Sequence, residues 1–158
     1  QPGDCIARAN SPLKMTINGL IEYLRLGIEP SKIVLGLPWY GYRYACTTLT
    51  GNKCRIERVP FRGCNCSDAV GKQFAYSQIL KWMEAESVDV QWNTDAQSPF
   101  FNFRENGRDF QVWFDNPKSI SMKRDVARTM GVIATGMWSA DDLNYADEIR
   151  SQEMWDAM

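Results

Sequence analysis

The chain has 158 residues, a formal net charge of −1 and no histidine. Without imidazole there is no Ser–His or Cys–His nucleophile, no histidine general base and no histidine metal ligand, so any chemistry has to come from carboxylates, tyrosines or lysines. Because positive and negative charges are balanced, we do not expect the basic face of a nucleic-acid binder. No apolar run approaches the roughly 18 residues of a membrane span. The length fits one domain with a real core, because 44% of the residues are hydrophobic.

The first predicted elements are a helix and a buried strand. Residues 16–27 repeat apolar side chains at helical spacing, with Thr16 as the N-cap and Gly27 just past the last turn. The apolar run 32–37 follows, and Pro38 ends it. A short strand that is apolar on both faces is typical of a parallel sheet covered by helices. These residues therefore predict half of an α/β unit.

Most cysteines fall in the next segment, where disulfides in an oxidising compartment are the favoured interpretation. The candidates are Cys46, Cys54, Cys64 and Cys66. A structural zinc site is disfavoured, because a C-x-C pair is too tight for zinc and no histidine helps. The pairing stays open, since four cysteines allow three pairings and Cys5 makes the count odd. Asn65-Cys66-Ser67 is an N-glycosylation sequon that agrees with a secretory route, although a disulfide at Cys66 could hinder its use.

The middle of the chain, from about 43 to 116, also predicts one helix and one hairpin. The helix covers 76–85, and the hairpin strands 100–104 and 110–114 flank an Asn-Gly turn signal. Antiparallel strands beside one helix indicate a small α+β insertion held together by disulfides.

The α/β pattern then resumes. Ser119 or Ser121 can cap a helix that runs to about 130, and Gly131 ends it. Residues 132–138 form a second apolar strand, and a last helix covers about 145–158. The predicted order is helix, strand, insertion, helix, strand, helix. A (β/α)₈ barrel needs about 250 residues, so this chain could hold only part of one.

Three ordered motifs resemble the family 18 glycoside hydrolases, the chitinases and their relatives. The first motif, KIVLGLPWYG at 32–41, is similar to the seventh barrel strand of that family. The second, VWFDNPKS at 112–119 together with Lys123, is similar to the segment that leaves the family's insertion domain. The third, at 131–138, is similar to the eighth barrel strand, which ends in Trp. Residues 59–63, 66–69 and 153–155 resemble one branch, the lysosomal exo-enzymes that trim the chitobiose core of Asn-linked glycans.

The resemblance implies a fold and a division of the chain. We expect an α/β protein that is the C-terminal part of a (β/α)₈ TIM barrel, namely strands seven and eight, with an α+β chitinase insertion domain. The expected boundaries are 1–43 for helix six and strand seven, 44–117 for the insertion, and 118–158 for helix seven, strand eight and helix eight. Two departures from the family pattern stand out. Cys64 replaces a small residue, and Asp141 stands where the branch has Cys, so we do not transfer the disulfide pairing of the branch.

The family's catalytic signature, D-x-x-D-x-D-x-E, does not occur in the printed sequence. The resemblance implies substrate-assisted retaining hydrolysis of the β-1,4 bond between two GlcNAc residues, in chitobiose cores or chitin oligosaccharides, with no cofactor or metal. The chain also has no initiator Met or leader pattern. We therefore expect the C-terminal portion of a longer enzyme or a partial gene model, and no catalytic residue in this chain.

The residues expected to bind substrate follow the two predicted barrel strands or border the insertion. They are Trp138, Trp39, Tyr40, Tyr42, Trp113 and Asp115. By the resemblance, Trp138 lies under the sugar in the −1 subsite, where a flat indole contacts the apolar face of a pyranose. Tyr40 either donates to the acetamido region or plugs the barrel, and a hairpin residue such as Trp113 is more often core. Tyr42 stands where many chitinases carry Arg, and Arg43 follows it.

Two other functions compete with a glycosidase. One is a catalytically inactive, lectin-type sugar-binding protein of the same fold, and the other is an independent α+β interaction module. The expected partners are N-acetylglucosamine oligosaccharides, with no nucleic acid and no membrane, and the full-length protein is expected to be a monomer. The expected location is the lysosome or the extracellular space. The isolated chain is expected to be inactive and to fold poorly, because its barrel strands would have unpaired edges.

Overall fold

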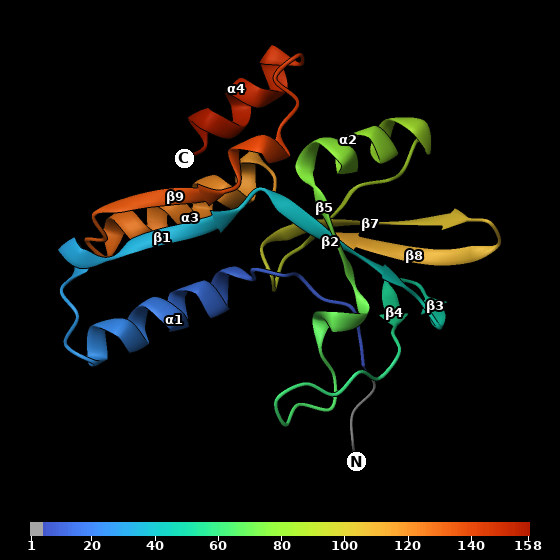
Figure 1. Cartoon of the computed structure of the whole chain (residues 1–158), viewed down its shortest axis with the longest axis horizontal. Coiled ribbons are helices and arrows are strands. Elements are labelled where there is room, and N and C mark those ends of the chain that lie inside the picture. The colour runs from blue at the N-terminus through green and yellow to red at the C-terminus, as the bar shows by residue number, and fades with distance from the viewer. Residues whose placement is uncertain (1–4) are drawn as a thin grey trace.

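The computed structural model describes residues 5–158, apart from the side chain of Asp68, so the opening residues 1–4 lie outside it. Figure 1 shows two groups of strands, with helices beside each. The helices are α1 (Leu13–Arg25), α2 (Tyr76–Ala85), α3 (Pro117–Thr129) and α4 (Glu148–Asp156), with short 3₁₀ turns η1 (Pro30–Lys32), η2 (Asp68–Val70) and η3 (Ala140–Asp142). The strands are β1 (Val34–Pro38), β2 (Tyr40–Ala45), β3 (Thr48–Thr50), β4 (Lys53–Arg55), β5 (Lys72–Ala75), β6 (Gln91–Asn93), β7 (Ser98–Glu105), β8 (Arg108–Trp113) and β9 (Ala134–Trp138).

The predicted parallel pairing is confirmed, because β1 and β9 form a two-stranded parallel sheet. Their register runs from Val34 beside Ala134 to Pro38 beside Trp138. One face of the pair is covered, since Leu37 is 1% exposed within the core shared with α3 and α4. The opposite face is open in the described chain, where Val34 is 60% exposed.

Helices α1, α3 and α4 cover the strand pair. Leu20 of α1 packs with Ala127 of α3 in one apolar cluster. Met154 of α4 is fully buried in the larger core, and the Arg124 guanidinium of α3 donates to the carbonyl oxygen of Asp156 at 3.1 Å. In Figure 1 α3 lies directly behind the strand pair. The helices therefore form the outer layer that the apolar strands require.

The middle of the chain forms a five-stranded antiparallel sheet, which confirms the predicted α+β pattern. Its strand order is β5-β2-β8-β7-β6. The predicted hairpin is β7 and β8, joined by Asn106 and Gly107, both with positive φ (50° and 76°). Two successive left-handed residues match the twist of a two-residue hairpin, which is why Asn-Gly favours this turn. Helix α2, also as predicted, packs on the face that contains Phe101, Phe103 and Val112.

The opposite face of this sheet is covered by the chain's own N-terminal segment and by the β3–β4 hairpin. The Ala7 amide donates to the carbonyl oxygen of Cys54 at 3.0 Å, and the Ile56 amide donates to that of Cys5 at 2.9 Å. These segments enclose Phe100 and Trp113, whose rings stack with centroids 4.6 Å apart.

The disulfide candidates were partly wrong. The bonds are Cys5–Cys66 and Cys46–Cys54, whereas Cys64 is a free, exposed thiol. Cys5 reaches Cys66 across a sequence separation of 61 residues because the N-terminal segment crosses the sheet face. Clustering in the sequence therefore favoured Cys64, while the tertiary path selected Cys5.

Two predicted helix caps were also wrong. Helix α1 begins at Leu13 after the extended residue Pro12, and Thr16 lies inside its first turns with its hydroxyl donating to the Pro12 carbonyl oxygen at 3.4 Å. Helix α3 is capped by Asn116, whose side chain accepts from the Ser119 amide, while the Ser119 hydroxyl accepts from the Asn116 amide in return. The serine thus completes a capping box from inside the helix.

The expected domain boundaries stay a prediction. Strand β2 starts at Tyr40 and belongs to the five-stranded sheet, so it runs through the expected boundary between 43 and 44. The second boundary, between 117 and 118, falls in the first turn of α3. Trp39 alone separates β1 of the strand pair from β2 of the sheet, and residues 114–116 lead from β8 of the sheet into α3.

Candidate functional site

The candidate site lies where β1 and β9 end side by side. The Trp39 amide, just past β1, donates to the carbonyl oxygen of Trp138 at 2.8 Å, which ties the two strand ends together. The Trp138 side chain is 69% exposed, more than most large apolar side chains in the described chain. An exposed indole at the carboxyl end of a parallel strand stands where α/β proteins place their ligands.

The loop after Trp138 is held by polar contacts. The Ser139 amide donates to the Asp142 carboxylate at 2.7 Å, and the Ser139 hydroxyl also contacts the carboxylate of Asp141. The Tyr145 hydroxyl donates to the Ala140 carbonyl oxygen at 2.8 Å. The carboxylates of Asp141 and Asp142 thus accept hydrogen bonds that stabilise the turn after Trp138.

Tyr40 and Tyr42 begin the sheet next to these strand ends. Both are half-buried, and their rings meet edge to face with centroids 6.0 Å apart. Tyr42 in turn stacks on Tyr44 at 6.1 Å, so the three rings follow one face of β2. Alternation along a strand explains this arrangement, since residues two apart share a face.

Arg43 points to the opposite face of β2. Its guanidinium lies 4.6 Å from the Phe110 ring centroid and 5.2 Å from those of Phe74 and Trp82, and it pairs with Glu105 at 3.3 Å. Such an aromatic cage stabilises the cation where it is. Arg43 therefore does not replace the arginine that many chitinases carry at the position of Tyr42.

The other three predicted site residues lie in the interior. Trp39 has no exposed surface and meets Trp155 edge to face at 4.9 Å; Trp113 is 5% exposed, and its indole N–H donates to Gln111 at 2.8 Å. Asp115 is 1% exposed. In the described chain, a sugar ring has no face of Trp39 or Trp113 on which to stack. These three residues therefore contribute to interior packing and not to an exposed binding surface.

Asp115 is paired with Lys123 in a fully buried ion pair that joins the end of β8 to α3. Burial raises the pKa of the Asp115 carboxyl and lowers the pKa of the Lys123 ammonium, while the attraction between the two charges opposes both shifts. The second carboxylate oxygen, Oδ2, is buried without a hydrogen-bond partner among the described residues. The ion pair of Lys123 with Asp115 was not predicted from the sequence. The signal for it is the position of Lys123, one to two helical turns after the Asn-Pro start of α3.

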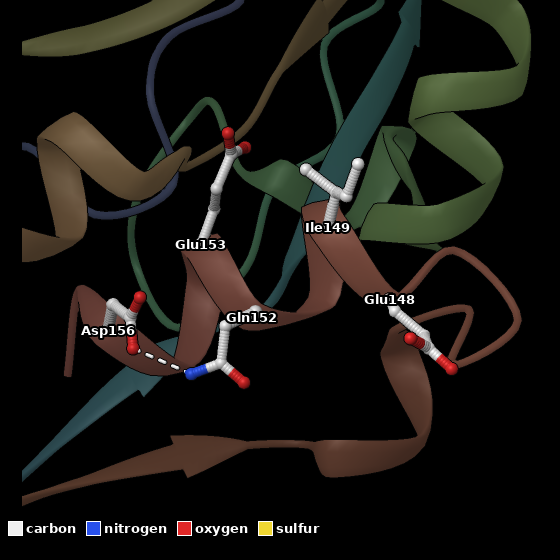
Figure 2. Close-up of a pocket in the computed structure, with 5 residues that line it drawn as sticks. All are labelled: Glu148, Ile149, Gln152, Glu153 and Asp156. Atoms are coloured by element: carbon white, nitrogen blue, oxygen red, sulfur yellow. Dashed lines mark hydrogen bonds between the residues drawn. The ribbon is translucent and has the colours of Figure 1, made fainter.

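Three surface hollows of the described chain lie away from this site. Figure 2 shows one of about 450 Å³ whose lining residues all come from α4, with the Gln152 amide donating to Asp156 at 2.7 Å. Two others lie beside α4, toward α2 and toward the start of α3. None of these three is lined by Trp138, Tyr40 or Tyr42. A deep catalytic cleft is therefore not formed by these hollows.

Within residues 5–158, no three His, Cys, Asp or Glu side chains gather closely enough to hold a metal ion. In the same described part of the chain, no helix has both the length and the apolar composition needed to cross a membrane.

Solved structures define the class of this fold. A class V chitinase from Nicotiana tobaccum in complex with NAG4 matches with a TM-score of 0.71 over 98% of this chain and 44% of that chain, at 14% identity. YKL-39 in the presence of chitooligosaccharides (GlcNAc4) matches with a TM-score of 0.72 over 96% of this chain and 45% of that chain, at 18% identity. The architecture is therefore the α/β fold of chitinases.

The sequence places the chain within that class. Residues 2–142 match the model of glycosyl hydrolases family 18, and the chain belongs to this family. Di-N-acetylchitobiase of Mus musculus is 45% identical over 161 residues, covering 98% of this chain and 44% of that protein. Di-N-acetylchitobiase of Homo sapiens is 38% identical, covering 98% of this chain and 42% of that protein. The chain thus spans less than half the length of these relatives.

Proposed function

We propose that this chain is the C-terminal portion of a glycosidase that cleaves the β-1,4 bond between two GlcNAc residues, in chitobiose cores of Asn-linked glycans or in chitin oligosaccharides. The observation that carries the proposal is Trp138, an exposed indole at the end of β9 in a family 18 chain similar to di-N-acetylchitobiases. Flat aromatic rings offer apolar contact to the C–H face of a sugar at low entropic cost.

In this proposal β1 and β9 are the seventh and eighth strands of a (β/α)₈ barrel. The open face of the strand pair supports this assignment, because Val34, Gly36, Ala134, Gly136 and Trp138 all lie on it or at its edge and are not covered by the described helices. The helix-covered face and the open face then correspond to the outside and the inside of a barrel. The residues 44–117 would form the insertion domain beside the active site.

The proposed reaction is substrate-assisted and retaining. The 2-acetamido carbonyl oxygen attacks C1, the leaving oxygen is protonated by a glutamic acid, and water then opens the oxazolinium intermediate. No residue of the printed sequence fits the D-x-x-D-x-D-x-E signature. The acid and its neighbouring aspartate would therefore come from residues outside this sequence, and the isolated chain would be inactive.

Trp138 would contact the sugar in the −1 subsite, and Tyr40 and Tyr42 would form the adjoining wall. The buried Trp39 would support this wall from the interior, and the buried Trp113 and Asp115 would hold the sheet that carries the tyrosines. Holding a substrate in the reactive geometry lowers the barrier only if the wall itself is fixed. The buried residues would thus act on the sugar through the residues they support.

The test is turnover of a fluorogenic N,N′-diacetylchitobioside by the complete protein that contains this chain. Trp138→Ala should lower kcat/KM about tenfold or more, because losing a ring contact of somewhat over 1 kcal/mol in the transition state has that effect. Phe61→Ala is the matched control, since Phe61 is 55% exposed on the loop after β4. Wild-type turnover with an unchanged kcat/KM in Trp138→Ala would refute the assigned role of Trp138.

A second candidate is a catalytically inactive protein that binds GlcNAc oligosaccharides. The exposed indole of Trp138 fits this function equally well, because stacking on a sugar needs no catalytic group. Calorimetric binding of chitotetraose by the complete protein without turnover would establish this alternative, whereas turnover would exclude it.

The proposed location is the lysosome or the extracellular space, with the complete protein as a monomer. The two disulfides support this location, because such bonds persist in oxidising compartments. Secretion of the complete protein from eukaryotic cells, followed by chromatography with light scattering, tests both points.

A further inference from the structure

The loop between β4 and η2 displays Asn65 to solvent. Just before it, Phe61 and Cys64 exchange backbone hydrogen bonds of 3.0 and 2.9 Å around Arg62 and Gly63, which have φ of 46° and 83°. This tight turn leaves the side chains of Cys64 and Asn65 exposed. Figure 1 shows the loop on the side of the molecule away from α4. A bulky group on Asn65 would therefore extend into solvent.

Asn65-Cys66-Ser67 is also the only Asn-x-Ser/Thr triplet without proline in the chain. The Cys5–Cys66 and Cys46–Cys54 bonds indicate an oxidising compartment, which in eukaryotic cells is also where oligosaccharides are attached to asparagine. The exposed side chain, the sequon and the compartment are three separate observations that agree on the same residue.

We propose that Asn65 is an N-glycosylation site whose use competes with closure of the Cys5–Cys66 disulfide. The donor is a polyprenyl-diphosphate-linked oligosaccharide. The Asn65 amide nitrogen forms a bond to the anomeric carbon and gives up one proton, while the bond from that carbon to the diphosphate oxygen breaks and the lipid diphosphate leaves with the electron pair. The product is a neutral, strongly hydrated glycan on the loop.

Competition follows from how the folded chain holds the sequon. Its middle residue, Cys66, is bonded to Cys5, and the backbone of Cys5 is itself fixed by the Ile56 amide. The Ser67 hydroxyl donates to the Val59 carbonyl oxygen at 2.8 Å and accepts from the Ala69 amide at 3.3 Å. Both residues after Asn65 are therefore immobilised.

A transferase must draw the triplet into its own active site in an extended form, with the Ser67 hydroxyl available. The disulfide and the Ser67 hydrogen bonds oppose that. Glycan transfer is thus expected on the chain before the Cys5–Cys66 bond closes, and early closure should leave Asn65 unmodified. A mixture of glycosylated and unmodified protein is the expected product.

The experiment is secretion of the complete protein from cultured eukaryotic cells, followed by peptide-N-glycosidase treatment and peptide mass spectrometry at residue 65. The wild type should show a slower electrophoretic band that is lost on treatment, with Asn65 converted to Asp. Asn65→Gln and Ser67→Ala should each lose that band. Asn18→Gln, an exposed residue of α1 outside any sequon, is the matched control and should retain it.

The competition is tested by the double substitution Cys5→Ala/Cys66→Ala, which keeps the Asn65-x-Ser67 triplet and removes the bond. Its glycosylated fraction should exceed that of the wild type. If the double variant is not secreted, the fraction is measured on wild-type chains in cells briefly treated with a membrane-permeant reductant. Absence of a glycan from both forms would overturn the site, and an equal fraction in both would overturn the competition.

Discussion

At the scale of single residues, Trp138 and Asp115 occupy opposite extremes of burial, 69% and 1% exposed. A sequence motif alone gave both residues the same expected role, contact with a sugar. Burial separates them, because a side chain without exposed surface cannot stack on a ligand. Asp115 instead neutralises Lys123 inside the protein, at the point where β8 passes into α3. This pair fixes one contact between the five-stranded sheet and the helix layer.

Removing one partner of that pair should be severe. Lys123→Met leaves the Asp115 carboxylate buried without its counter-charge, so we expect the free energy of unfolding to fall by about 3–5 kcal/mol. Asp115→Leu combined with Lys123→Met should recover most of this loss, because apolar replacement of both partners restores packing without a buried charge. Urea denaturation measures all three proteins. Glu105→Gln, which breaks the partly exposed pair with Arg43, is the control and should cost less than about 1 kcal/mol. A small loss in Lys123→Met would contradict the assigned ion pair.

The buried phenol of Tyr76 should make the protein less stable at alkaline pH. Burial, followed by the charge of Glu153, raises the pKa of its phenol from 10.0 to about 12. The folded chain thus favours the neutral phenol, and the resulting stability is fully present below pH 10 and is lost as the pH rises through 12. The loss is about 2–3 kcal/mol, at 1.36 kcal/mol for each pKa unit. Tyr76→Phe should remove this part of the pH dependence, measured by urea denaturation between pH 9 and 12. Identical alkaline profiles for the variant and the wild type would count against the burial of this hydroxyl.

At the scale of elements, Gly41 permits the close packing of β2 against β8 and α2. A Cβ at this position would lie 2.4 Å from the Trp113 carbonyl oxygen and 2.7 Å from both Ile79 Cδ1 and Phe114 Cβ. Two of these three atoms belong to the backbone or lie next to it, so they cannot move aside cheaply. The sheet and its helix therefore depend on the absence of a single methyl group.

Gly41→Ala should consequently destabilise the protein, by about 1–3 kcal/mol as for other overpacked core positions. Gly19→Ala is the matched control. A Cβ at Gly19 meets nothing within 4 Å, and α1 should gain about 0.5–1 kcal/mol from the better helix former. Thermal unfolding of the two variants should thus shift in opposite directions. An unchanged or upward shift for Gly41→Ala would show that the close contact at Gly41 is relieved by movement of its neighbours.

The sequence predicted most elements and their order, because each carries its own local signal. Periodic apolar residues marked α2, and Asn106-Gly107 marked the β7–β8 turn. What it could not predict depends on tertiary contacts. The path of the N-terminal segment decides that Cys5 and not Cys64 joins Cys66, and no local pattern records that path. The same distinction holds for the candidate site. The place of Trp138 at the end of an apolar strand could be predicted from the sequence, whereas the burial of Trp39 results from tertiary packing against α4.

At the scale of the whole molecule, the two sheets of the described chain differ in how many of their faces are covered. The five-stranded sheet is covered on both faces, by α2 and by the disulfide-linked N-terminal segment. The strand pair is covered on one face, and within residues 5–158 β1 and β9 pair only with each other. Each strand therefore has one free edge, next to apolar side chains such as Val34 and Ile133 that are 60% and 64% exposed. Free edges and apolar surface favour association with further strands.

The open face predicts opposite effects of one substitution in two contexts. In the isolated 158-residue chain, Val34→Lys places a charge on an exposed strand and should reduce self-association, which size-exclusion chromatography with light scattering detects. In the complete protein the same charge would face the interior of the proposed barrel, so we expect a loss of about 3 kcal/mol or more in unfolding free energy. Phe61→Lys, on the exposed loop after β4, should leave the stability of the complete protein within about 0.5 kcal/mol. If Val34→Lys were as well tolerated as Phe61→Lys in the complete protein, β1 would face solvent there and the barrel assignment would be wrong.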